Sequence, residues 1–160
     1  MYYAALAALR DMIKECLGDI ACDYATFVSL GEPPAQCDSI SVFMDSVSRD
    51  DTSSSTCQLI TDDAFTVTMT KCCAEREEFD PTQEDLDAQC FLEDLYALKT
   101  CLDCNIADTL SEFTHDCGPD ITRIEFDGEK QGGCYSASIH ISMSEFNCCP
   151  DPVIPPDPGP

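Results

Sequence analysis

The chain has 160 residues, of which 31 are acidic and eight are basic, and its formal net charge is −23. This charge repels nucleic-acid phosphates and anionic membrane surfaces, which excludes proteins that bind either one through a basic patch. Apolar residues make up 44% of the sequence, enough to form the core of one domain of this length.

The N-terminal segment, residues 3–17, predicts an amphipathic helix that ends at Gly18. Its apolar side chains recur at helical spacing: Leu6, Leu9, Ile13, Cys16 and Leu17. Charged residues follow from Arg10 onward, where the apolar region of a signal peptide would continue. We therefore expect a helix of the mature protein rather than a signal peptide.

The next segment predicts an irregular connector and then a strand. The run Gly31-Glu32-Pro33-Pro34 cannot continue a helix or lie inside a sheet. Residues 39–44 predict a strand with Ser39 and Ser41 on one polar face. A polar loop, Asp50–Thr56, follows it.

Residues 65–70 predict a half-buried antiparallel strand, which could begin as early as residues 57–60. The alternation places three apolar side chains inward, Phe65, Val67 and Met69. The three threonines between them are expected to face solvent.

The strongest helix start in the sequence is at Asp80. Asp80 is a suitable N-cap, Pro81 suits the first helical position, and Gln83 can close a capping box. The apolar stripe consists of Phe91, Leu95, Leu98 and Leu102, and the expected helix covers residues 82–104. Residues 103–120 are expected to be a connector.

The C-terminal part predicts an antiparallel hairpin. Residues 121–126 form its first strand, Asp127–Gly133 a glycine-rich turn, and Tyr135–Met143 its second strand, which alternates over nine residues. A proline-rich segment follows. We expect one α+β domain over residues 1–147, with two helices on one face of a small antiparallel sheet, and an extended tail over residues 148–160.

Several residues could in principle form a metal site. Cys101 and Cys104 have zinc-ligand spacing and could combine with His115 and Cys117. We favour the interpretation that both are ordinary thiols near the end of a helix. A thioredoxin-like role is disfavoured, because the pair would end a helix instead of beginning one. The carboxylates Asp45, Asp50, Asp51, Asp62 and Asp63 could suggest calcium, but their order differs from that of a calcium loop.

No catalytic constellation is predicted. His140 lies on the polar face of the last strand between Ser138 and Ser142, so we expect it to be solvated or at an interface. No G-x-S-x-G elbow, phosphate loop or dinucleotide fingerprint is present. We therefore expect a protein that is not an enzyme, with no catalytic residue, no cofactor and no metal site.

The 13 cysteines are an odd number, so at least one lies outside any intrachain disulfide. We expect most of them to be buried and reduced at synthesis, with a few oxidising later. Two adjacent pairs, Cys72–Cys73 and Cys148–Cys149, lack the spacing of a zinc knuckle.

The order helix, strand, strand, long helix and hairpin, with a proline-rich connector after the first helix, resembles the tail terminator proteins of long-tailed bacteriophages. The similarity covers roughly residues 1–146 and rests on element order, size, acidity and the many cysteines of the N-terminal half, with no signature motif. It implies a hexameric ring that caps the tail tube, joins it to the head connector and lets DNA pass without specific binding. It also implies assembly in the host cytoplasm and no membrane partner.

Two other classes stay open, and a hydrolase is a distant third. One is a different neck or tail component, such as a head-completion or tube protein, for which less helix is expected. The other is a secreted binding module stabilised by disulfides or zinc. Within the terminator interpretation, we expect the loop Asp50–Thr56 and the turn Asp127–Gly133 to contact neighbouring subunits.

Overall fold

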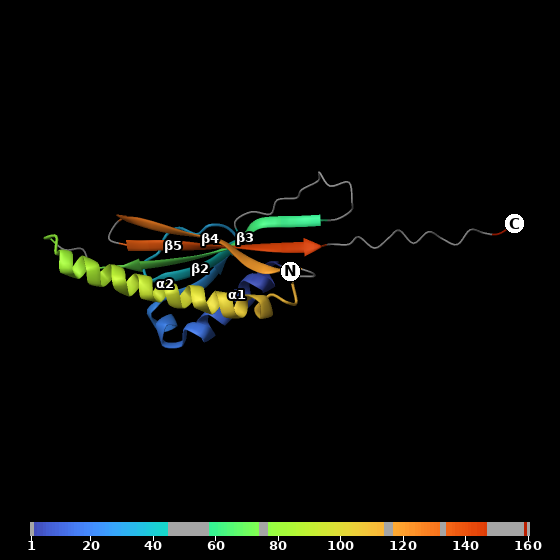
Figure 1. Cartoon of the computed structure of the whole chain (residues 1–160), viewed down its shortest axis with the longest axis horizontal. Helices are drawn as coiled ribbons and strands as arrows, with labels where there is room; N and C mark the ends of the chain where they lie inside the picture. Colours follow the sequence, from blue (N-terminus) through green and yellow to red (C-terminus); the bar gives the residue numbers. More distant parts are fainter. Residues whose placement is uncertain are drawn as a thin grey trace.

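The computed structural model describes residues 2–44, 58–73, 77–113, 117–131, 134–146 and 159. A five-stranded sheet and two α-helices form an α+β fold, in which both helices lie on one side of the sheet (Figure 1). The polar loop at residues 50–56 and the proline-rich residues 150–158 lie outside the described residues. Predictions that concern those segments are therefore not tested.

Both predicted helices are present. Helix α1 covers Tyr2–Leu17 and is followed by a short 3-10 helix, Gly18–Asp23, where Gly18 has a positive φ of 54° that glycine adopts readily. Helix α2 covers Pro81–Thr109. It extends beyond residue 104, where the sequence predicted its end, and the extension buries Ile106 against the core.

The start of α2 confirms the predicted N-cap. The Asp80 carboxylate accepts hydrogen bonds from the backbone N–H groups of Thr82, at 3.1 Å, and Gln83, at 3.4 Å. The Gln83 side chain donates to Asp87 Oδ1 at 3.0 Å rather than closing the predicted capping box. One carboxylate therefore caps two of the free N–H groups of the first turn.

The sheet is mixed rather than purely antiparallel, which corrects the prediction. Its strands lie in the order β1-β2-β3-β5-β4, and β1 runs parallel to β2 while the other pairs are antiparallel. Their bounds are β1 Ala25–Ser29, β2 Ser39–Met44, β3 Gln58–Cys72, β4 Cys117–Gln131 and β5 Cys134–Phe146. Strand β1 lies in the segment that the sequence predicted to be irregular. The sequence did not indicate this strand, because its five residues show no clear apolar alternation.

The predicted pairing of the two alternating strands is confirmed. Strands β3 and β5 are antiparallel, with Val67 opposite Ile139. Strand β4 is longer than predicted, since residues 117–120 and 127–131 also belong to it. The segment Asp127–Gly133 is therefore mostly strand, and residues 132 and 133 alone lie between β4 and β5.

The core lies between the helices and the sheet. The α1 stripe is buried as predicted at Leu6, Leu9 and Ile13, whereas Cys16 is exposed. From α2, the predicted stripe is buried in full: Phe91, Leu95, Leu98 and Leu102. The sheet contributes the three inward residues predicted for β3, together with Ile139 and Ile141 of β5.

Candidate functional site

The face of the sheet opposite the helices carries a ladder of hydroxyl groups. Because side chains alternate along a strand, Thr66, Thr68 and Thr70 of β3 share this face. They stand opposite residues of β5 in register: His140, Ser138 and Ser136. The Thr68 and Ser138 hydroxyls are hydrogen-bonded at 2.9 Å, and those of Thr70 and Ser136 at 3.5 Å.

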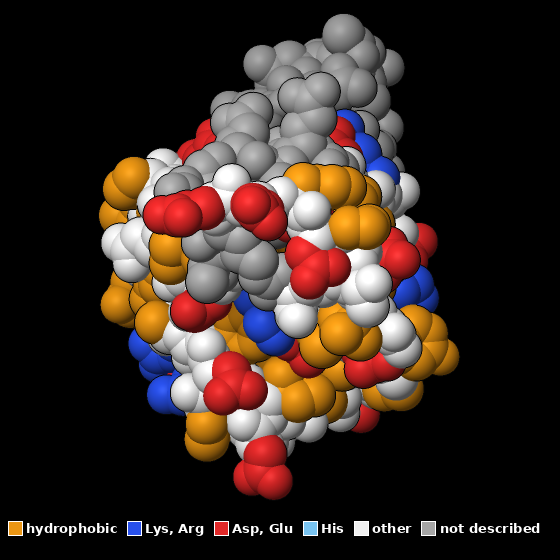
Figure 2. Space-filling model, turned by 90° about the vertical axis from the view of Figure 1, so that its left-hand side faces the viewer, with side chains coloured by type: hydrophobic (Ala, Val, Ile, Leu, Met, Phe, Trp, Pro, Cys, Tyr) orange, Lys and Arg blue, Asp and Glu red, His pale blue; other side chains and the backbone are white. Residues whose placement is uncertain are grey.

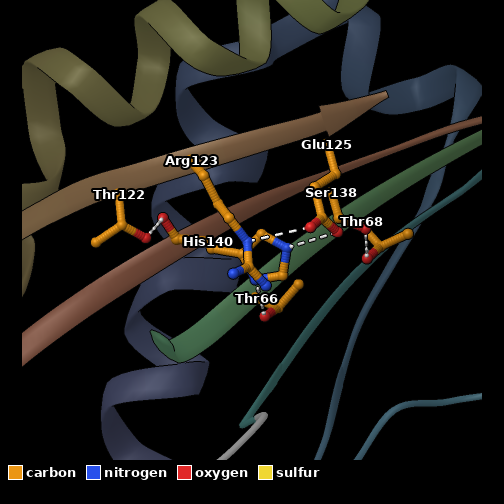
Figure 3. Close-up of polar contacts among 7 residues, drawn as sticks. All are labelled: Thr66, Thr68, Thr122, Arg123, Glu125, Ser138 and His140. Carbon is orange, nitrogen blue, oxygen red and sulfur yellow. Dashed lines mark hydrogen bonds and ion pairs between the residues drawn. The ribbon is translucent and has the colours of Figure 1, made fainter. Parts of the chain in front are cut away.

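His140 continues this ladder and is buried, not solvated, which corrects the prediction. Its side chain lies at the centre of the close-up in Figure 3, and the residue is 4% exposed. Its Nδ1 lies 3.2 Å from Thr66 Oγ1, and its Nε2 lies 3.2 Å from Glu125 Oε2. The sequence could not show this burial, because the partners come from two strands that the fold places on either side of β5.

The His140 contacts resemble a carboxylate–imidazole–hydroxyl relay, but the burial of the hydroxyl group argues against catalysis. Thr66 carries the hydroxyl that would be the nucleophile among these three residues. It is 1% exposed, and its hydroxyl faces the His140 imidazole rather than a substrate cleft. Glu125 also pairs with Arg123, whose Nε lies 3.2 Å from Glu125 Oε1. We interpret the cluster as a polar link that joins β4 and β3 across β5.

A small cavity lies over the same face. Its volume is about 140 Å³, and hydroxyl groups form one wall: Ser39, Ser41, Thr68, Thr70, Ser136 and Ser138. The connector between β1 and β2 forms the other wall through Glu32, Pro33, Pro34, Ala35 and Gln36. The connector explains why Ser39 and Ser41, on the predicted polar face of β2, are buried. Thr66 and Thr70 are buried as well, which corrects the prediction that the threonines of β3 face solvent.

Of the cysteines and histidine considered for zinc, the structure describes the side chains of Cys101 and Cys104, which differ in their surroundings. Cys101 is buried and forms a disulfide with Cys16 of α1, while Cys104 is an exposed free cysteine. Both lie inside α2 rather than at its end, because the helix continues to Thr109. His115, the Cys117 side chain and the five aspartates considered for calcium lie outside the described side chains.

A different set of cysteines does converge. Within the part of the chain that the structure describes, the three sulfurs of Cys37, Cys72 and Cys134 all lie within 4.8 Å of one another. Of the nine cysteines with described side chains, Cys101 alone is buried, so the expectation that most are buried is wrong for these residues. The sequence could not identify the trio, because it depends on the register of β3 and β5.

A second polar cluster joins α2 to the sheet beneath it. The Tyr24 hydroxyl donates to Asp94 Oδ2 at 2.6 Å, and Lys71 Nζ lies 3.0 Å from the same oxygen. The Lys71 ammonium also lies 5.8 Å from the centre of the Tyr24 ring. Burial and the adjacent Asp94 carboxylate raise the pKa of Tyr24 well above its ordinary value.

The outer side of α2 leaves apolar side chains uncovered. Leu92 lies nine residues, or about two and a half helical turns, before Cys101, so it faces away from α1. Next to α2, Phe126 of β4 packs its ring 5.9 Å from that of Phe91. We call Leu92, Tyr96, Ile124 and Phe126 the α2–β4 flank; they are between 39% and 71% exposed.

Comparison with protein-family models and with curated proteins found no match for this sequence. None of the helices among the described residues is both long and apolar enough to cross a bilayer.

Proposed function

We propose that this protein is a structural subunit of a bacteriophage tail, a terminator that ends the tail tube and joins it to the head connector. The observation that carries the proposal is the two-layer arrangement, in which two helices lie on one face of a single sheet. The two helices on one face agree with what the sequence resemblance implies, although the sheet is mixed rather than antiparallel. The subunit acts by shape and charge rather than by catalysis.

The two edges of the sheet are different strands, which suits a subunit of a ring. Strands β1 and β4 are the edges of the sheet, at opposite ends of the strand order. A ring requires a heterologous contact, in which one side of each subunit meets a different side of the next. Each subunit has such a pair of sides, and six subunits would close the ring that the resemblance implies.

The α2–β4 flank is the side that we assign to the neighbouring copy. Two of its side chains, Leu92 and Tyr96, line a shallow groove together with Asp85, Ala88, Gln89 and Glu93. Copies that each carry a charge of −23 repel one another, so an apolar contact offers a place where they can approach closely. The expected occupant of the flank is therefore a second copy of this chain.

The charge suits a channel for DNA. Figure 2 shows carboxylates distributed over one end of the molecule, with apolar side chains between them. A ring of six chains would carry a formal charge of six times −23, or −138. A lumen with this charge repels phosphates, so DNA passes through without specific binding. The ring would assemble in the host cytoplasm and remain in the neck of the virion.

The test is the mass of the native full-length protein, alone and in the presence of tail tubes. We expect a hexamer, and we expect the double variant L92E/Y96E to remain folded but monomeric, because two carboxylates would enter the contact. A wild-type protein that stays monomeric with tail tubes present would refute the terminator function.

Leu86→Glu provides a matched control. Leu86 is 49% exposed and Leu92 is 51% exposed, and both lie on α2, but Leu86 does not line the groove. We expect L86E to assemble as the wild type does. If L86E and the flank variant lose assembly equally, the loss reflects added charge, and the assignment of the flank is wrong.

A further inference from the structure

Three cysteines from separate segments meet at one end of the sheet. Cys37 lies in the connector before β2, Cys72 ends β3 and Cys134 begins β5. Cys72 and Cys134 are register partners with Cα atoms 4.0 Å apart, and the Cα of Cys37 lies 5.2 Å from that of Cys72. The Cys37 and Cys134 sulfurs are 3.6 Å apart.

Disulfide chemistry cannot use all three sulfurs. The Cys72 sulfur lies at bonding distance from both Cys37 and Cys134, but one cysteine forms one disulfide bond at a time. Oxidation therefore leaves the third sulfur in contact with a completed disulfide. When the trio is reduced, three thiols converge on one point.

We propose that the reduced trio is a zinc site. Zinc bonds thiolate sulfur at about 2.3 Å, so two sulfurs of a tetrahedral site lie about 3.8 Å apart. The 3.6 Å between the Cys37 and Cys134 sulfurs is close to this separation, whereas the Cys72 sulfur, at bonding distance from both, would have to move away from them on reduction. Three soft sulfur ligands select zinc over calcium or magnesium, which prefer oxygen. The exposure of Cys37 leaves the fourth position open to water or to an external ligand.

The backbone around Asp38 orients the trio. Asp38 has a φ of 48°, a left-handed conformation that turns the chain between Cys37 and β2. Its side chain accepts a hydrogen bond from the Cys72 backbone N–H at 3.2 Å, and its carbonyl accepts one from Ala25 N–H at 2.8 Å. Asp38 thus fixes the connector, and with it Cys37, to β3 and β1.

Binding is a proton exchange with no redox step. One zinc ion displaces the three thiol protons, and each sulfur forms one bond to the metal. The acidic chain attracts a cation. The two positive charges of zinc also offset two of the three negative charges of the thiolates. Zinc would then hold the connector against the ends of β3 and β5, next to the hydroxyl-lined cavity.

The experiment uses the full chain, reduced with a phosphine without oxygen and then titrated with Zn²⁺ or Co²⁺. We expect one zinc ion per chain by native mass spectrometry and a thiolate-to-cobalt charge-transfer band with Co²⁺. C37S should weaken zinc binding by at least about 100-fold, the upper end of what loss of an outer-shell partner costs. C104S, which changes an exposed cysteine outside the trio, should bind zinc as the wild type does.

Alkylation gives a test that needs no variant. Zinc should protect Cys37, Cys72 and Cys134 from iodoacetamide, as mapped by peptide mass, and should leave Cys104 reactive. A reduced wild-type chain that binds no zinc, zinc binding unchanged in C37S, or protection confined to other cysteines would each overturn the proposal. None of these results depends on ring assembly, so the site and the proposed function can fail separately.

Discussion

The disulfide between Cys16 and Cys101 is expected to supply a large part of the stability of the helix pair. It joins the end of α1 to α2 across a sequence separation of 85 residues, with Cα atoms 5.9 Å apart. In the chain-entropy treatment, a loop of this length stabilises the fold by about 4.6 kcal/mol at 25 °C. Measured disulfides reach about 2–4 kcal/mol, so we expect C16A/C101A to lose that amount of unfolding free energy.

The assay is urea unfolding of the oxidised full-length protein, followed by circular dichroism. C104A is the control: Cys104 also lies on α2, three residues from Cys101, but is an exposed free cysteine, so its replacement should change the midpoint little. If C16A/C101A and the wild type unfold at the same urea concentration, the covalent link does not stabilise the fold. Alkylation of both residues in the oxidised wild type would show that the link is not formed.

Three further predictions concern the residues that position the helices. The folded-state pKa of Tyr24 is raised, so the stability that Tyr24 contributes is complete below the ordinary tyrosine pKa of about 10 and is lost as the pH rises above that value. Between about pH 9 and 11, Y24F should therefore lose less unfolding free energy than the wild type. Equal losses, measured by urea titration, would contradict this. D80A should lower the unfolding free energy by about 1 kcal/mol, since two N–H groups lose their cap, while D80S should restore most of it. F91A should lower the unfolding free energy by about 3–5 kcal/mol, measured by thermal or urea unfolding, because Phe91 of α2 is fully buried and stacks on Tyr135. A loss below about 1 kcal/mol would mean that the surrounding residues fill the space and leave no cavity.

Local sequence determined the elements whose signals are contained within a few residues. The Asp80-Pro81 start of α2 depends on groups adjacent in the chain, and it is found where the sequence predicts it. The alternation in residues 65–70 and 135–141 likewise fixes which side chains face the core, since a strand has a period of two. These features required no knowledge of distant contacts.

The tertiary structure alone decided what the polar positions do. The serine, threonine and histidine pattern predicts a solvent face, but the β1–β2 connector and the Glu125 side chain of β4 cover it. The connector is distant in sequence from β5, and Glu125 reaches His140 only through the register of the β4–β5 hairpin. Cys37, Cys72 and Cys134 are separated by 35 and 62 residues, so only the strand register and the turn at Asp38 bring their sulfurs together. Burial of a polar group and convergence of ligands are properties of packing between segments, which periodicity along one segment cannot contain.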